Sequence, residues 1–181
     1  MRIDQIRKEN IKKYHDIEYI LIDDFFDPEL FETLHKKYLL EYTVIEKLEH
    51  HYVISGHYLL DLLHTDKDKI LAAVNSVWQE NCVENRTSVT LMTKDLKLPI
   101  HNDTHWENVP VRGILYLNGI CGTTFYSDYK GSNPVIIGGK PNQLLLFKVS
   151  EHSYHSAGTE TIDRGDRFVI TMMFDRTQEQ E

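Results

Sequence analysis

The stretch Arg86-Thr-Ser-Val-Thr-Leu-Met-Thr93 marks a change from a mostly helical to a mostly strand-like pattern. Within it, Val89 and Leu91 alternate with Ser88 and Thr90, as expected for a strand with one buried face. Further short strands are predicted downstream at residues 113–118, 123–127, 135–137, 143–147 and 168–174. Turns rich in Gly, Asn and Asp separate them, and the strongest turn covers residues 138–142. This pattern is typical of an antiparallel sandwich or barrel.

The first 85 residues are expected to supply mostly helices. Apolar spacing predicts helices over residues 3–14, 28–38 and 68–80, with one short strand at 19–22. Asp27 followed by Pro28 is a favourable helix start, because Asp caps free N–H groups and Pro fits the first turn. We therefore expect one domain over residues 1–181, with a mostly helical support (1–85) and a β core (86–175).

The composition is that of an ordinary globular protein. Hydrophobic residues make up 41% and charged residues 27% of the 181 residues, a length that suits one domain. No apolar run reaches the roughly 18 residues of a membrane helix, so no membrane partner is expected. Cys82 and Cys121 form no C-x-x-C motif and the N-terminus lacks the apolar stretch of a secretory signal, so a cytoplasmic location is predicted. The net charge of −8 disfavours a nucleic-acid partner, which needs a basic surface.

A candidate metal site follows the predicted strand end Leu98-Pro99-Ile100. His101-Asn102-Asp103 supplies an imidazole and a carboxylate that lie on the same side of an extended chain, because strand side chains alternate with period two. A second imidazole, His155, comes 54 residues after His101, and Arg167 opens another predicted strand twelve residues later. Two imidazoles and one carboxylate leave positions on an octahedral iron open for co-substrate and oxygen.

Residues 86–175 resemble the core of the prolyl-hydroxylase-like branch of the 2-oxoglutarate/Fe(II) dioxygenases. The matching motifs occur in the family's order: His101 and Asp103, Tyr116-Leu117-Asn118, the turn Gly122-Thr123-Thr124-Phe125, Asn142-Gln143-Leu144-Leu145-Leu146-Phe147, His155, and the strand that Arg167 opens. The segment Tyr19 to Leu39 is also similar to the family's opening strand and helix. Two positions depart from the pattern. Val169 stands where part of the wider superfamily has Ser, and Thr123 stands where many relatives have a second Gly.

The resemblance implies a fold, a ligand set and an activity. The fold is a double-stranded β-helix, the cupin-like jelly roll, braced by N-terminal helices. The iron ligands are His101, Asp103 and His155. Arg167 pairs with the distal carboxylate of 2-oxoglutarate, a geometry that suits its planar fork, and hydroxyls of Tyr116 and Thr171 add hydrogen bonds. The implied cofactors are Fe(II), the co-substrates 2-oxoglutarate and O₂, and ascorbate as a candidate reductant.

The implied reaction is hydroxylation of an unactivated C–H bond. A carboxylate at Asp103 favours hydroxylation over halogenation, since related halogenases have a small residue there that leaves room for chloride. A prolyl or other residue of a peptide or protein is the first substrate hypothesis, a free amino acid or small metabolite the second, and nucleic acid the third. The alternative is a non-catalytic cupin-like module that binds a metal or ligand. Arg167 and Tyr116 argue against it, because a plain metal binder needs no buried Arg beside its ligands.

Several other residues compete for these roles. In His64-Thr65-Asp66, a second H-x-D, we interpret Thr65 or Asp66 as a helix cap. His105 is interpreted as part of the site's rim or the surface, and His152 as the weaker alternative to His155, which precedes the small residues 156–158. Arg164 is the weaker alternative to Arg167, because residues 163–166 are predicted to form an exposed turn. His50, His51 and His57 are interpreted as surface residues, and Cys121 as a small buried strand residue. Tyr116 has the alternative role of a plain core residue.

Overall fold

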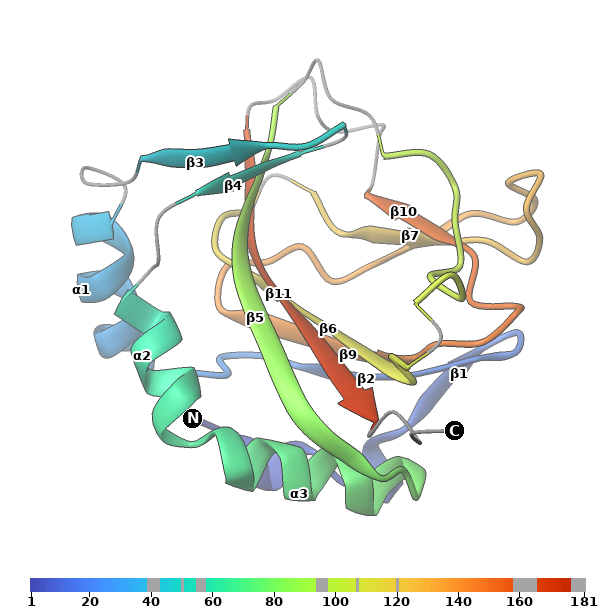
Figure 1. Ribbon diagram of the computed structural model, residues 1–181, viewed down its shortest axis with the longest axis horizontal. Coiled ribbons are helices and arrows are strands. Elements are labelled where there is room, and N and C mark those ends of the chain that lie inside the picture. Colours follow the sequence, from blue (N-terminus) through green and yellow to red (C-terminus); the bar gives the residue numbers. More distant parts are fainter. Residues whose placement is uncertain are drawn as a thin grey trace, which may run out of the picture.

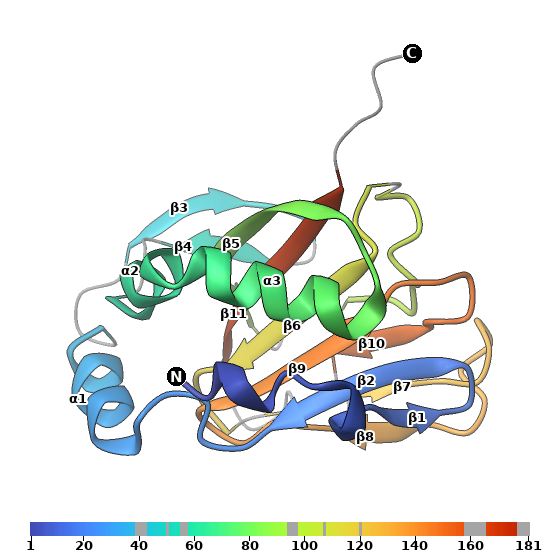
Figure 2. The same cartoon turned by 90° about the horizontal axis from the view of Figure 1, so that it is seen from below.

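The computed structural model describes residues 1–38, 43–49, 51–54, 58–93, 98–106, 108–119, 121–157 and 166–176. Two antiparallel β-sheets face each other, and the helices lie along one side of the larger sheet (Figures 1 and 2). The architecture is the predicted jelly roll with bracing helices. None of the helices among these residues is long and apolar enough to cross a membrane.

Eight strands form the larger sheet. Their order is β1 (Lys12–Tyr14), β2 (Ile17–Ile22), β9 (Gln143–Lys148), β6 (Val111–Tyr116), β11 (Arg167–Arg176), β5 (Cys82–Met92), β4 (Tyr52–Ile54) and β3 (Val44–Lys47). The smaller sheet has the order β10 (His155–Ala157), β7 (Thr123–Phe125) and β8 (Val135–Ile137). Residues from distant parts of the sequence therefore meet in the space between the two sheets.

Three α-helices cover the outer side of the larger sheet: α1 (Pro28–Tyr38), α2 (Tyr58–Thr65) and α3 (Lys67–Trp78). At the start of α1, Asp27 Oδ1 accepts a hydrogen bond from the backbone N–H of Leu30 at 3.0 Å, as the cap prediction requires. On α3, Ile70 and Val74 are fully buried and belong to the core that the helices share with the sheet. Helical spacing of apolar residues thus positions α3 against the sheet.

Alternation along each strand divides the buried residues between two cores. On β11, Ile170, Met172 and Phe174 face the helices, whereas Val169 faces the smaller sheet. On β9, Leu145 likewise belongs to the core between the sheets. Burying a side chain of this size contributes roughly 1.5–3 kcal/mol, so the period-two pattern fixes which face of each strand lines the interior.

The N-terminal prediction was wrong in part. Residues 3–14 form no α-helix: two 3₁₀ turns (η1, Ile3–Gln5, and η2, Lys8–Asn10) lead into β1. The cause is pairing with the next strand, because β1 forms an antiparallel hairpin with β2 and its main chain is satisfied in the sheet. Residues 1–85 also contain strands β2 to β4, the start of β5 at Cys82, and helix α2. Of these elements, the sequence predicted only β2.

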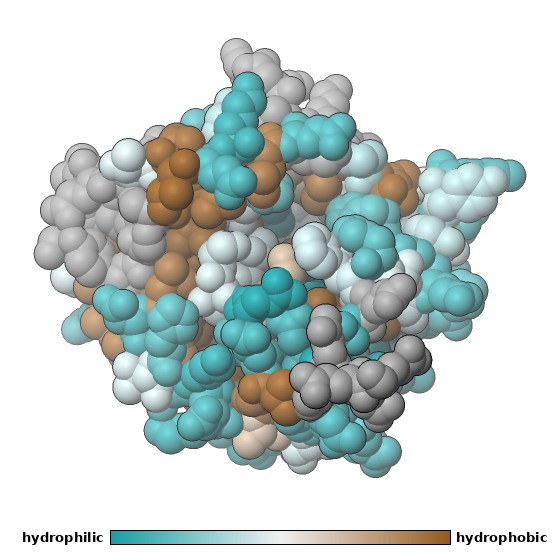
Figure 3. All heavy atoms as spheres, in the orientation of Figure 1, coloured by the Kyte–Doolittle hydropathy of each residue, from teal (hydrophilic) through white to brown (hydrophobic). Residues whose placement is uncertain are grey.

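The edge strand β3 carries exposed apolar side chains. Val44 and Ile45 are 47% and 68% exposed, and apolar surface gathers over β3 on the face seen in Figure 3. The strand pairs only with β4 among the described residues. The β3–β4 hairpin therefore brings an apolar edge close to the space between the sheets, which its residues Leu48 and His51 help to line.

Candidate metal centre and carboxylate pocket

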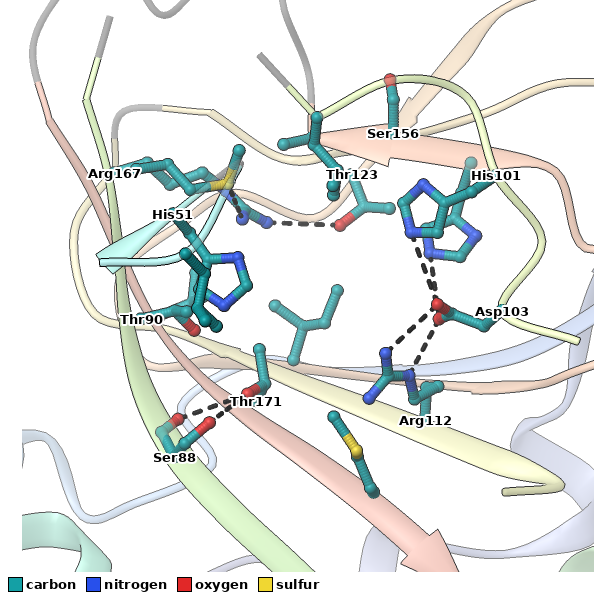
Figure 4. Close-up of a pocket in the computed structure, with 18 of the residues that line it drawn as sticks. His51, Ser88, Thr90, His101, Asp103, Arg112, Thr123, Ser156, Arg167 and Thr171 are labelled. Atoms are coloured by element: carbon teal, nitrogen blue, oxygen red, sulfur yellow. Dashed lines mark hydrogen bonds and ion pairs between the residues drawn. The ribbon is translucent and has the colours of Figure 1, made fainter. Parts of the chain in front are cut away.

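A cavity of about 710 Å³ lies between the two sheets. Its walls come from β5, β6 and β11 of the larger sheet, from β7 and β10 of the smaller sheet, and from the β3–β4 hairpin. His101, Asp103 and Arg112 lie at one end, and Arg167 lies at the other with Thr123 between (Figure 4). The cavity is thus a single pocket with two polar ends.

His101 and His155 are brought together by their own backbones. The N–H of His101 donates to the carbonyl of His155 at 3.0 Å, and the N–H of His155 donates to the carbonyl of His101 at 2.8 Å. This single antiparallel bridge places the two imidazoles on the same side, with ring centroids 4.2 Å apart. Two residues far apart in the sequence therefore present one pair of ligand atoms.

Each imidazole is oriented by a carbonyl oxygen. Nδ1 of His101 lies 2.8 Å from the carbonyl oxygen of Pro99, and Nδ1 of His155 lies 2.8 Å from that of Ser153. A carbonyl oxygen only accepts hydrogen bonds, so each Nδ1 carries a proton and each Nε2 is the ring nitrogen that faces Asp103. This arrangement is the usual one for metal-binding histidines.

Asp103 completes a group of three. Its Oδ1 lies 3.5 Å from Nε2 of His101, and its Oδ2 lies 3.4 Å from Nε2 of His155. The ligand atoms of the three residues all lie within 4.8 Å of one another. Two imidazole nitrogens and a carboxylate at this spacing fit a divalent metal with open coordination positions.

The local structure of this motif differs from the prediction. Residues 98–100 form no strand, and Asp103 has a φ of 64°, in the left-handed region. Asp tolerates this region better than most residues. The two side chains of the H-x-D motif therefore converge through one β-bridge and one left-handed residue, and not through the period-two alternation of a strand.

Arg112 of β6 forms a two-pronged ion pair with Asp103. Its Nε donates to Oδ2 at 2.8 Å and its Nη2 donates to Oδ1 at 3.1 Å. Burial alone would raise the pKa of Asp103, but its contacts with His155 and Arg112 outweigh burial and hold that pKa well below its usual range. Burial, with His155 alongside, lowers the pKa of His101 and favours its neutral form. Both residues are therefore in the ionisation state that a metal ligand needs.

Arg167 is a buried cation at the other end of the pocket. It is 4% exposed, and its Nε has no hydrogen-bond partner among the described residues. Its other nitrogens make long contacts of 3.5 Å to the sulfur of Met92 and to Oγ1 of Thr123. Because a buried charge is costly unless it is paired, this guanidinium fits a ligand carboxylate.

Tyr116 and Thr171 lie in different surroundings. The Tyr116 ring lies beneath the Arg167 guanidinium, with the ring centroid 5.5 Å from Cζ of Arg167. The Tyr116 hydroxyl lies 2.8 Å from Oγ1 of Thr123 and donates to the carbonyl of Ile137 at 3.2 Å. Burial raises the pKa of Tyr116, so its hydroxyl stays protonated. Thr171 lines the pocket on the same face of β11 as Arg167 and Val169, because strand side chains alternate with period two, and its Oγ1 lies 2.8 Å from Oγ of Ser88.

Among the competing histidines, two lie at the pocket. His105 is exposed and lines it, in agreement with a place at the rim. His51 also lines it, so its assignment to the surface was wrong: the β3–β4 hairpin, which the sequence did not reveal, brings it there. His152 is exposed and lies outside the three-residue metal group.

The remaining interpretations concern capping and turns. Asp66 occupies the N-cap of α3 but makes no capping hydrogen bond, and it pairs with Lys69 instead. Nε2 of His64 lies 2.9 Å from Oγ1 of Thr87. Cys121 is buried as expected, but the strand assignment was wrong, because it lies two residues before β7. The other residues, His50, His57 and Arg164, lie outside the described residues.

Two pocket residues were not foreseen. Arg112 alternates with Ile114 and Tyr116 along β6, so its inward direction could have been derived from the period of the strand. Thr123 holds the Tyr116 hydroxyl and contacts Arg167. The Gly122 backbone before it passes so close to β8 that a Cβ would lie 2.6 Å from the carbonyl oxygen of Gly138. A glycine there lets Thr123 reach its position.

Comparison with known proteins identifies the fold. No protein-family model and no curated protein sequence matches the chain. Among solved structures, a prolyl-4-hydroxylase from Pseudomonas putida has a TM-score of 0.65 at 15% identity, covering 88% of this chain and 92% of that chain. A prolyl hydroxylase from Trichoplax adhaerens, in complex with a hypoxia inducible factor peptide fragment, has a TM-score of 0.67 at 14% identity, covering 97% and 87%.

The chain has the prolyl-hydroxylase fold. An oxidoreductase of the 2OG-Fe(II) oxygenase family from Burkholderia pseudomallei has the same fold, with a TM-score of 0.57 at 12% identity and coverage of 97% and 90%. The predicted fold class and the resemblance to prolyl-hydroxylase-like oxygenases are thereby confirmed at the level of the fold. The two polar ends of the pocket are observed directly in this chain, at His101, Asp103 and His155 and at Arg167.

Proposed function

We propose that the protein is an Fe(II)- and 2-oxoglutarate-dependent dioxygenase that hydroxylates an unactivated C–H bond. The observation that carries the proposal is the pairing of two sites in one cavity. A His-Asp-His group able to hold a metal lies at one end, and a buried guanidinium that pairs with no carboxylate among the described residues lies at the other. A co-substrate that chelates iron and ends in a carboxylate satisfies both ends.

The residues of the pocket have separate tasks in this proposal. His101, Asp103 and His155 hold the iron, and Arg167 anchors the distal carboxylate, with hydroxyls of Tyr116 and Thr171 as further hydrogen-bond partners. Bound iron supplies the oxidising chemistry, in which decarboxylation of 2-oxoglutarate by O₂ is coupled to hydroxylation of substrate. Ascorbate would serve as a reductant. Asp103 fills the position that a halide would need, so the product is expected to be hydroxylated. A chlorinated product from the unmodified protein would contradict this.

A peptide or protein residue, prolyl or other, is the first substrate we propose. The neighbour from Trichoplax adhaerens was solved with a peptide fragment. In this chain the pocket opens beside Trp106, which is 41% exposed, and beside Leu48, which is 37% exposed. Such apolar residues at the rim suit an extended chain that lays side chains on the surface. A free amino acid or small metabolite is the second hypothesis.

An anaerobic titration tests the function without knowledge of the substrate. Fe(II) and 2-oxoglutarate together should produce a weak visible charge-transfer band, and admission of O₂ should release succinate. A protein that binds the metal but shows no band and no succinate would be a non-catalytic cupin-like module instead. The cytoplasmic location remains a prediction from the sequence, which cell fractionation would test.

A further inference from the structure

We propose that Arg112 is a positioning residue that fixes the Asp103 carboxylate for metal binding. The inference rests on the proposed metal centre and adds a residue that does not touch the metal. Both prongs of the Arg112 guanidinium are used on one carboxylate, at 2.8 and 3.1 Å. Planar paired contacts of this kind fix direction as well as distance.

Asp103 needs such support because its backbone is not held by a sheet. His101 and His155 are joined by two backbone hydrogen bonds, whereas Asp103 lies in a bend with a φ of 64°. Its carbonyl accepts a hydrogen bond from the N–H of Trp106 at 3.0 Å, which shapes the turn but leaves the side chain free to rotate. The side-chain contact with Arg112 therefore decides where the carboxylate points.

Arg112 is well placed to supply that direction. Strand β6 lies inside the eight-stranded sheet, and Arg112 is paired with Phe147 of β9 on one side and with Met173 of β11 on the other. Its side chain is only 14% exposed. A rigid strand thus transmits its position through the guanidinium to a carboxylate on a loop.

The geometry leaves the carboxylate ready for a metal. Each oxygen of Asp103 accepts one bond from Arg112 and keeps a lone pair, and each lies about as far from an imidazole Nε2, at 3.5 and 3.4 Å. The guanidinium charge works in the opposite direction, because a cation near the site repels a divalent ion. The proposal is that the orienting effect outweighs this repulsion. Outer contacts of this kind typically change metal affinity about 10–100-fold when removed.

The test uses Co(II) alone, titrated into the full chain without 2-oxoglutarate or O₂ and followed by its visible absorption. Arg112→Lys keeps the charge but cannot reproduce the fork, and Arg112→Met removes both. We expect Co(II) affinity to fall roughly tenfold in Arg112→Lys and about 10–100-fold in Arg112→Met. The shape of the Co(II) spectrum should change as well, because the carboxylate loses its fixed direction.

Arg86 offers a matched control. It forms the same two-pronged pair with Asp175, at 2.6 Å for both contacts, on the surface of the same sheet and away from the pocket. Arg86→Lys should leave Co(II) affinity unchanged. Thermal unfolding of the metal-free variants separates folding from positioning, and if Arg112→Met does not fold, Arg112→Lys still decides the question.

Three outcomes would overturn the inference. Affinity unchanged in Arg112→Lys would mean that charge, and not the fork, matters. A lowered unfolding temperature with normal Co(II) affinity and spectrum would assign Arg112 to stability alone. Tighter binding by Arg112→Met would mean that repulsion dominates. Failure of the unmodified protein to bind Co(II) is a different result, because it would remove the metal centre itself and the inference with it.

Discussion

The two ends of the pocket differ in how far the protein satisfies its own polar groups. At the metal end, formed by His101, Asp103 and His155, the imidazole Nδ1 atoms and both carboxylate oxygens have partners within the chain. At the anchor end, the Arg167 guanidinium lies over the Tyr116 ring, has two contacts at 3.5 Å, and has one nitrogen with no hydrogen-bond partner among the described residues. The first end is organised before any ligand arrives, and the second depends on a ligand to complete it.

The largest expected effect is loss of the metal end. Alanine at His101, Asp103 or His155 should abolish Fe(II)-dependent succinate production, because a ligand from the group of three is lost. The loss is measured as succinate released by each variant with Fe(II), 2-oxoglutarate and O₂. The matched control is His152→Ala, an exposed histidine three residues before His155, which should keep its activity. Full activity in His155→Ala together with loss of activity in His152→Ala would show that the wrong distal histidine has been assigned.

A smaller but still large effect is expected at the anchor end. Breaking a buried ion pair typically costs roughly 3–5 kcal/mol, so Arg167→Ala should weaken 2-oxoglutarate binding by on the order of 10² or more. Fe(II) binding should survive, and Arg167→Lys should recover only part of the affinity. Titration of 2-oxoglutarate into the anaerobic Fe(II) forms of Arg167→Ala and Arg167→Lys measures the affinity of each variant for 2-oxoglutarate.

Arg176 provides the control for that experiment. It lies on the same strand, β11, has a side chain that is 47% exposed, and pairs with Glu80. Arg176→Ala should bind 2-oxoglutarate like the unmodified protein. If Arg167→Ala also bound 2-oxoglutarate like the unmodified protein, the comparison between the two ends would fail, because the Arg167 guanidinium would not be the anchor of the co-substrate.

Single hydroxyls at the anchor end should matter less. A neutral hydrogen bond contributes about 0.5–1.5 kcal/mol, so Thr171→Val and Tyr116→Phe should each weaken 2-oxoglutarate binding by roughly tenfold or less. The Tyr116 hydroxyl already has two partners, Thr123 and Ile137. No change in Tyr116→Phe alone would assign Tyr116 to the core, as its alternative interpretation holds.

The smallest effect is expected at the rim. His105 is exposed and lies beside Trp106, with ring centroids 5.1 Å apart and planes tilted by 46°, and it lies outside the three-residue group. His105→Ala should therefore leave both Co(II) and 2-oxoglutarate affinity within a factor of about two, well below the cost of losing one hydrogen bond to a ligand. A loss comparable to that of His155→Ala would extend the metal end to a fourth residue.

The sequence predicted most of the β core because period-two alternation is local. Strand β8 matches its prediction residue for residue, and β9 and β11 differ from theirs by one to three residues. The same period of two places Arg167 and Thr171 on one face of β11, and both line the pocket. The three residues of the metal end were likewise picked out by residue type and by their order along the chain.

Other features depended on which segments of the chain fold against one another. A single β-bridge joins His101 to His155, the fork of Arg112 holds Asp103, and a hairpin brings His51 to the pocket. Residues 3–14 carried a helical pattern, yet they end in a strand because β2 offers hydrogen-bond partners. Residue types and local periodicity determined which side chains could form a site. Only the tertiary structure decided which of them are already paired, because a hydrogen bond or ion pair depends on where two distant segments meet.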